Sequence, residues 1–163
     1  MIFEPKDLIC TDDWKKWFDE NINIVPTLLS DLILKEIRRN LNSISSPRLY
    51  LGLFPQQIIM YGHLIGAKLE GEKLKYSQLR RFVDALKEID NLKNWQDKLY
   101  KINLFPIYLV NGAARQDKLL LFTSTINGII MNNWIIEQED FDTLLQLVDS
   151  ITSYFGSFRK EDK

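Results

Sequence analysis

Hydrophobic residues along this chain recur mostly at intervals of three and four, the spacing that places side chains on one face of an α-helix. Such stripes predict helices over residues 12–23, 26–42, 55–71 and 137–155, and a further one with Ser77 as its expected N-terminal cap. Glycine and proline, which interrupt helices, number only 7 and 5 and lie mostly between the stripes. We therefore expect an all-α fold, a compact helical bundle of about six helices.

The middle of the chain is harder to divide. In residues 48–54 leucines alternate, which suits a strand, but no second strand is predicted to pair with it, so we expect an extended linker. After Ser77 the apolar stripe changes face near Asp90, so either the helix breaks there or its two halves pack against different neighbours. Pro106 is expected to begin another helix. Residues 118–132 are apolar around most of their circumference, which predicts a helix at the buried centre of the bundle.

Two glycines, Gly62 and Gly66, lie on the apolar side of the helix predicted over residues 55–71. This spacing allows another helix to approach closely. Glycines in a helix are more often merely tolerated, so the pattern alone leaves both interpretations open.

The composition is that of one soluble domain. The chain has 163 residues and a formal net charge of -1, and 45% of its residues are hydrophobic. No apolar run approaches the ~18–20 residues that cross a bilayer, and the first residues do not resemble a signal peptide, which predicts a cytoplasmic protein without membrane contact. We expect an N-terminal helical extension packed on the bundle, a helical core and a polar tail, over residues 1–54, 55–158 and 159–163.

The sequence lacks the patterns of catalytic and metal-binding sites. One cysteine, Cys10, and one histidine, His63, exclude an internal disulfide and are too few for a zinc or iron–sulfur site. We expect His63 to be structural or at the surface, and Cys10 to be a buried or incidental thiol. Neither glycine-rich phosphate-binding motif is present. We therefore predict no enzymatic activity, no catalytic residue, no metal and no cofactor.

Charge is distributed unevenly along the chain. Residues 1–72 carry a net charge of -2 and residues 119–163 one of -4, whereas residues 73–118 hold 10 basic and 5 acidic residues, a net charge of +5. A basic stretch gathered on one face is the electrostatic footprint of a phosphate binder. The ordinary alternative is a solvated helix face, and charge alone does not separate the two.

The positions of the cations favour phosphate binding slightly. Arg80 and Lys87 project on nearly the same bearing from their predicted helix, away from its apolar stripe. Arg81 lies closer to Asp84 and Glu88, so an ion pair within the helix is at least as good an interpretation for it as a ligand contact.

A second set of candidates lies on the following segment. Tyr108 and Arg115 share one side of their predicted helix, with the small Asn111 and Gly112 between them, and Lys118 follows one turn later. A ring, a planar guanidinium and little intervening bulk suit the close approach of a sugar–phosphate chain.

Three stretches are similar to one known family. Residues 74–82 (LKYSQLRRF) resemble the motif L-T-T-S-Q-[IL]-R-K-F of the small helical subunit of type III-A CRISPR effector complexes. Residues 107–115 (IYLVNGAAR) resemble its second motif, an aromatic–alanine run that ends in arginine. Residues 140–141 and 153–154 (DF and SY) resemble its closing D-F … A-Y pattern. Residues before about 55 have no counterpart in the family, which hints at a divergent subtype such as III-D.

The resemblance implies a non-catalytic subunit, present in more than one copy, that lies along the duplex of guide RNA and target RNA and contacts its backbone rather than its bases. It also implies contacts with the backbone-repeat subunits, with the large polymerase-type subunit and with further copies of itself. By motif, the RNA-binding residues are Arg80, Arg81 and Arg115. Lys87 and Lys118 are added to them from helix geometry and proximity.

Two other functions compete with this one. The first is a helical protein–protein adaptor or dimerisation module without nucleic-acid binding, whose interface would include the glycine pair, the tryptophans and the apolar stripe over residues 92–102. The second is a DNA-binding regulator. We disfavour the regulator because base-reading residues are not concentrated at a helix start within residues 73–118.

Overall fold

The structure, a computed structural model, describes residues 26–158 of the chain; the helix predicted over residues 12–23, Cys10 and the polar tail at residues 159–163 lie outside them. The described residues form seven α-helices, six of them of seven residues or more, and no strand, which confirms the all-α bundle. In chain order the elements are α2 (Pro26–Leu41), α3 (Leu49–Gly52), α4 (Pro55–Gly71), α5 (Tyr76–Asp90), α6 (Trp95–Arg115), the short 3₁₀ helix η2 (Asp117–Leu119), α7 (Leu120–Met131) and α8 (Gln138–Phe158).

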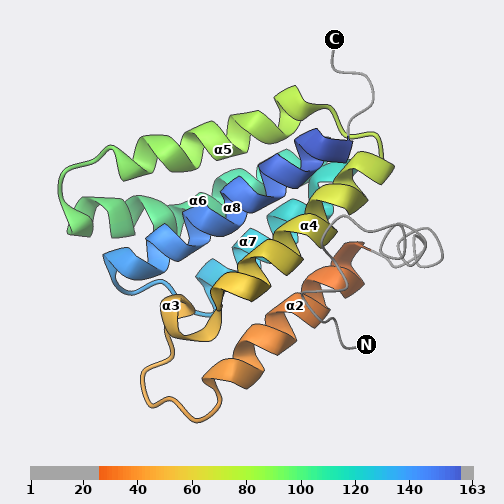
Figure 1. Ribbon diagram of the computed structural model, residues 1–163. Helices are drawn as coiled ribbons and strands as arrows, with labels where there is room; N and C mark the ends of the chain where they lie inside the picture. Colours follow the sequence, from red (N-terminus) through yellow and green to blue (C-terminus); the bar gives the residue numbers. More distant parts are fainter. Residues whose placement is uncertain (1–25, 159–163) are drawn as a thin grey trace.

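The helices pack in two layers. Figure 1 shows α4 and α8 in front of α6 and α7, with α5 along one edge and α2 along the opposite edge. Helix α4 lies against α8 over much of its length, α2 and α6 pack on α7, and α5 contacts both α6 and α8. One continuous apolar core joins these elements, and it includes side chains from α2 and α3 as well as from every later helix.

Burial is greatest on α4, where every residue from 61 to 69 is buried. The sequence predicts the central position for residues 118–132, and α7 is indeed mostly buried. A single apolar stripe on α4 does not reveal that this helix is covered on all sides, because His63 and Lys68 interrupt the hydrophobic pattern and yet are buried.

The prediction of an extended linker over residues 48–54 is wrong, because α3 forms there. Leu49 and Leu53 are buried while Leu51 is exposed, so the burial follows the four-residue period of a helix. Tertiary hydrogen bonds hold this turn: the Leu49 N–H donates to the Trp134 carbonyl (2.7 Å), and the Tyr50 N–H donates to the Asp140 carboxylate (2.9 Å).

The change of apolar face near Asp90 marks a break between two helices. Helix α5 ends at Asp90, and α6 begins at Trp95, where the Asn94 side chain accepts a hydrogen bond from the Gln96 N–H (2.7 Å). Helix α5 itself starts at Tyr76, one residue before the predicted cap, Ser77. There the Lys75 N–H donates to the Gln78 side chain (3.2 Å) in place of a serine cap.

Pro106 lies inside α6 and does not begin a helix, contrary to the sequence prediction. A proline lacks the N–H that would bond to the carbonyl of Ile102, so it weakens the helix at this point. The helix continues because Ile102, Phe105, Pro106 and Leu109 are all buried, and packing on the core holds both sides of the proline in register.

Gly62 marks a close approach between α4 and α8. A Cβ atom at this position would lie only 2.9 Å from the carbonyl carbon of Ser150 and would overlap its side chain. The structure therefore supports close helix approach over a merely tolerated glycine at Gly62.

Candidate nucleic-acid interface

The candidate arginines are exposed because of the way α5 packs. Its apolar stripe of Leu79, Phe82, Val83 and Leu86 is buried, as predicted, so the residues between these positions face solvent. Arg80, Arg81 and Lys87 are all exposed.

Helices α5 and α6 pack closely where the ring of Phe82 contacts Gly112. A Cβ atom at Gly112 would lie 2.7 Å from Cε1 of the Phe82 ring and closer still to its Cζ, so glycine allows the two helices to come this close. The ring of Tyr108 packs on Phe82 with centroids 4.9 Å apart, and on Phe105 with centroids 5.6 Å apart. The two stretches that carry the first two family motifs are thus joined by their own motif residues.

This packing forms a shallow depression between α5 and α6, of about 430 Å³. Two arginines, two carboxylates, one aromatic ring and two small residues line it; we call it the α5–α6 depression. Its lining residues are Ser77, Arg80, Arg81, Asp84, Ala85, Glu88 and Tyr108.

The ion pair within α5 differs from the sequence prediction. Asp84 pairs with Arg80, four residues before it (Nε to Oδ2, 3.5 Å), and not with Arg81. The two side chains are 65% and 58% exposed, so water screens this pair and its guanidinium stays available to a ligand. Arg81 has no ion pair among residues 26–158.

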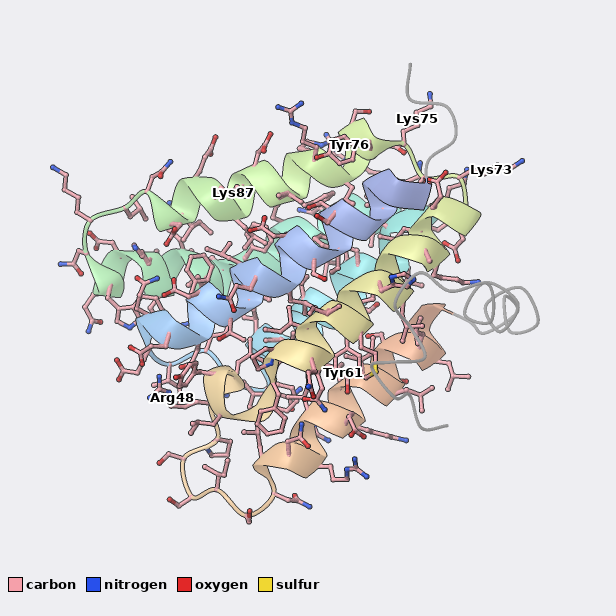
Figure 2. The ribbon with its side chains drawn as sticks, viewed as in Figure 1. Arg48, Tyr61, Lys73, Lys75, Tyr76 and Lys87 are labelled. Carbon is pink, nitrogen blue, oxygen red and sulfur yellow. The ribbon has the colours of Figure 1, made fainter. Side chains whose placement is uncertain are left out.

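Lys87 points to a different neighbour. Its Nζ lies 3.3 Å from the Oδ1 of Asp149 on α8, and both side chains are more than half exposed. It does not line the α5–α6 depression, although it projects from α5 on nearly the same bearing as Arg80. Figure 2 shows Lys87 on the same helix, in its second half.

Arg115 and Lys118 lie where α6 passes into η2, and both are exposed. Because Gly112 contacts Phe82, this end of α6 lies beside the first half of α5, but neither Arg115 nor Lys118 lines the depression. Burial raises the pKa of Glu72, at the end of α4, and this effect is opposed mainly by Lys68 and to a smaller extent by the positive charge of Lys118.

The sequence analysis did not identify three further exposed cations, Lys73, Lys75 and Lys101. Lys101 is exposed on α6 and precedes Tyr108 by seven residues, so it shares a side with Tyr108 and Arg115; that spacing could have identified it. Lys73 and Lys75 extend from the turn between α4 and α5, at the end of the bundle where α8 ends (Figure 2). Only the folded arrangement brings that turn to this end of the bundle.

Asp140, the first residue of the third family motif, stabilises the fold. The Asp140 carboxylate is fully buried and accepts hydrogen bonds from the N–H groups of Ile136 (3.1 Å), Glu137 (2.8 Å) and Tyr50 (2.9 Å). It also forms an ion pair with the Arg48 Nε at 3.0 Å. We call these groups the Asp140 cluster; it fixes α3 to the first turn of α8, where Figure 2 shows Arg48.

The described part of the chain offers no metal site and no membrane span. No group of three or more potential metal-ligating side chains occurs within residues 26–158. The same residues contain no helix of the length and apolarity that crossing a bilayer requires. His63 is buried in α4, and this burial lowers its pKa to about 4, so its imidazole is neutral at pH 7.

Comparison with known proteins gives one result. No curated protein and no solved structure matches the chain significantly. The family model Csm2 Type III-A matches residues 54–161, about two thirds of the chain. This family is a non-catalytic structural component of the CRISPR effector complex. The chain therefore belongs to the Csm2 family, the small subunit of the type III-A CRISPR effector complex.

Proposed function

We propose that this subunit binds the duplex of guide RNA and target RNA through sequence-independent contacts to the RNA backbone, as part of antiviral defence. The observation that carries the proposal is the α5–α6 depression, where Arg80 and Arg81 are exposed beside Tyr108. Exposed cations extend the basic surface: Arg115 at the end of α6, Lys118 in η2, and Lys87 of α5 beside Asp149 of α8.

The physical requirement is that every guide sequence must be accepted. Contacts to phosphate and sugar position a duplex without reading its sequence, so arginines on fixed helices suit this task. The guanidinium fork matches phosphate oxygens and loses little freedom on binding when it is carried by a packed helix. Tight packing of α5 on α6 through Phe82 and Gly112 provides that rigidity.

We further propose that the subunit contacts the backbone-repeat subunits, the large polymerase-type subunit and further copies of itself, within a cytoplasmic complex. Exposed apolar side chains of the kind that subunit contacts bury support this part: on α6 they are Tyr100, Leu104, Ile107 and Val110. We also propose that residues 1–54 extend the family core, because the family match begins at residue 54 and α2 packs on α7.

The test of RNA binding is a double charge reversal, Arg80→Glu with Arg115→Glu. We expect it to abolish association with a guide–target RNA duplex at moderate salt while circular dichroism shows an unchanged fold. The matched control reverses Lys35 and Arg39 on α2, which Figure 1 places at the edge opposite α5. The control changes the net charge equally and should bind nearly as the wild type does.

Two results would overturn the proposal. Unchanged affinity of the Arg80/Arg115 variant would favour a helical protein–protein adaptor without nucleic-acid binding. Equal losses in both double variants would mean that only net charge matters and that the α5–α6 surface has no special role.

A further inference from the structure

We propose that the α5–α6 depression holds one unpaired RNA nucleotide, with its base stacked on Tyr108 and its phosphate bound by Arg80 or Arg81. This inference deepens the proposed function and rests on it. It assigns to this surface a ligand that a continuous duplex backbone does not provide.

Tyr108 is built as a fixed platform. Its side chain is 38% exposed, and its ring is supported by Phe82 at 4.9 Å and by Phe105 at 5.6 Å. Phe82 in turn is held against Gly112, where no Cβ fits. An aromatic ring held in this way can stack with any base at little cost in side-chain freedom, whereas a duplex backbone has no flat face to offer it.

The charges that line the depression also favour a single nucleotide. Arg80 and Arg81 can bind one phosphate, but Asp84 and Glu88 line the same depression. Carboxylates repel further phosphates, and they accept hydrogen bonds from the exocyclic amino groups of bases. Two cations, two anions and a ring can therefore bind the phosphate, the base edge and the base face of one nucleotide.

The size of the depression agrees with such a ligand. Its volume of about 430 Å³ falls within the ~300–1,000 Å³ of small-molecule sites. Ser77, in the first turn of α5, adds a hydroxyl that can bond to a ribose or phosphate oxygen.

The test compares two RNA duplexes with the full-length protein. One is fully paired, and the other is identical except for a single unpaired adenosine in one strand. We expect the wild type to bind the second duplex about tenfold more tightly. Tyr108→Leu should lose this preference, measured as the ratio of its affinities for the two duplexes, and Tyr108→Phe should keep it because the ring remains. Tyr100→Leu, at an exposed tyrosine elsewhere on α6, is the matched control and should behave as the wild type.

The outcomes separate this inference from the proposed function. If the wild type binds both duplexes equally, or if Tyr108→Phe loses the preference as Tyr108→Leu does, the nucleotide site is wrong while backbone binding stands. If the wild type binds neither duplex, the proposed function fails first. Circular dichroism of each variant confirms that a loss of preference is not a loss of fold.

Discussion

The Asp140 cluster and the α5–α6 depression are both built from arginines and carboxylates, but they use them in opposite ways. In the cluster, the side chains of Arg48 and Asp140 are 23% and 0% exposed, and the carboxylate accepts three backbone hydrogen bonds in addition to the ion pair. In the depression, Arg80 and Asp84 are 65% and 58% exposed and share one long contact of 3.5 Å. Burial and the number of bonds, not the presence of charge, therefore separate an ion pair that stabilises the fold from one that leaves its guanidinium accessible at the surface.

We expect the largest loss of stability from disrupting the buried Asp140 cluster. Asp140→Ala leaves the Nε of Arg48 and three backbone N–H groups without their acceptor, so we expect the free energy of unfolding to fall by about 3–5 kcal/mol. Chemical denaturation measures it. The control is Asp149→Ala, which removes an exposed partner of Lys87 and should cost less than about 1 kcal/mol. Similar losses of unfolding free energy in the two variants would contradict the distinction between buried and exposed ion pairs.

Burial also predicts a pH dependence that the exposed arginines lack. His63 has a pKa of about 4 in the folded protein, against 6.5 as its ordinary value, because burial disfavours the charged imidazole. The unfolded chain therefore takes up a proton that the folded protein does not, and stability falls as the pH is lowered from about 6.5 to about 4, by up to about 3 kcal/mol.

The measurement is the free energy of unfolding at pH 7, 6 and 5 for the wild type and for His63→Gln. The variant does not titrate in this range, so its stability should decline less steeply than that of the wild type. Equal slopes would show that His63 is not responsible. Affinity for an RNA duplex should stay constant between pH 6 and 8, because arginine remains protonated.

Close helix packing gives the next largest effect. Gly62→Ala places a Cβ atom 2.9 Å from the carbonyl carbon of Ser150, and backbone cannot move aside as a side chain can. We expect a net loss of about 1–3 kcal/mol in the free energy of unfolding, despite the better helix propensity of alanine. Gly128→Ala is the control, because the atoms nearest to its Cβ would belong to the side chain of Leu34, which can move aside more easily than backbone. A loss at Gly128 as large as that at Gly62 would contradict this account.

A pair of arginine variants tests the comparison directly. Arg81→Gln should lower the slope of log affinity against log salt concentration by about one unit and leave stability unchanged, because one phosphate contact is lost from a solvated surface. Arg48→Gln should lower stability and leave the salt slope unchanged, since this arginine is bonded to Glu139 at 2.7 Å and to Asp140 at 3.0 Å. The experiment is a salt titration of RNA binding together with thermal unfolding. A stability loss in both variants, or a slope change in both, would remove the distinction.

Sequence patterns predicted the parts of this molecule that depend on local periodicity. The buried stripe of α5 and the break near Asp90 follow from the spacing of apolar residues. The helical turn at α3 could not be predicted in the same way, because it is held by Asp140, some ninety residues further along the chain. Pro106 misled the prediction for a related reason: burial of its neighbours outweighs its local preference for a helix start.

The candidate site shows the same limit. Arg80 and Tyr108 were each identified from helix geometry, but their shared depression depends on the contact between Phe82 and Gly112. Lys87 projects from α5 on nearly the same bearing as Arg80, but it does not share the depression. Its neighbour is Asp149 of α8. Which cations lie together is decided by tertiary packing, and a single sequence does not contain that information in readable form.

The smallest effect concerns Lys73, in the turn that leads into α5. Its φ angle of 61° lies in the left-handed region, where it ends α4 with the Leu74 N–H bonded to the Leu69 carbonyl (3.2 Å). Lys73→Gly relieves the steric cost of a Cβ atom there but loosens the unfolded chain, so we expect a net gain of about 0.5–1 kcal/mol in the free energy of unfolding. Lys73→Ala removes the same charge and keeps the Cβ atom, so it should show no gain. Both variants lose the same cation, and any fall in RNA affinity should therefore be equal in the two. A fall only in the glycine variant would mean that the conformation of the turn, rather than its charge, matters for binding.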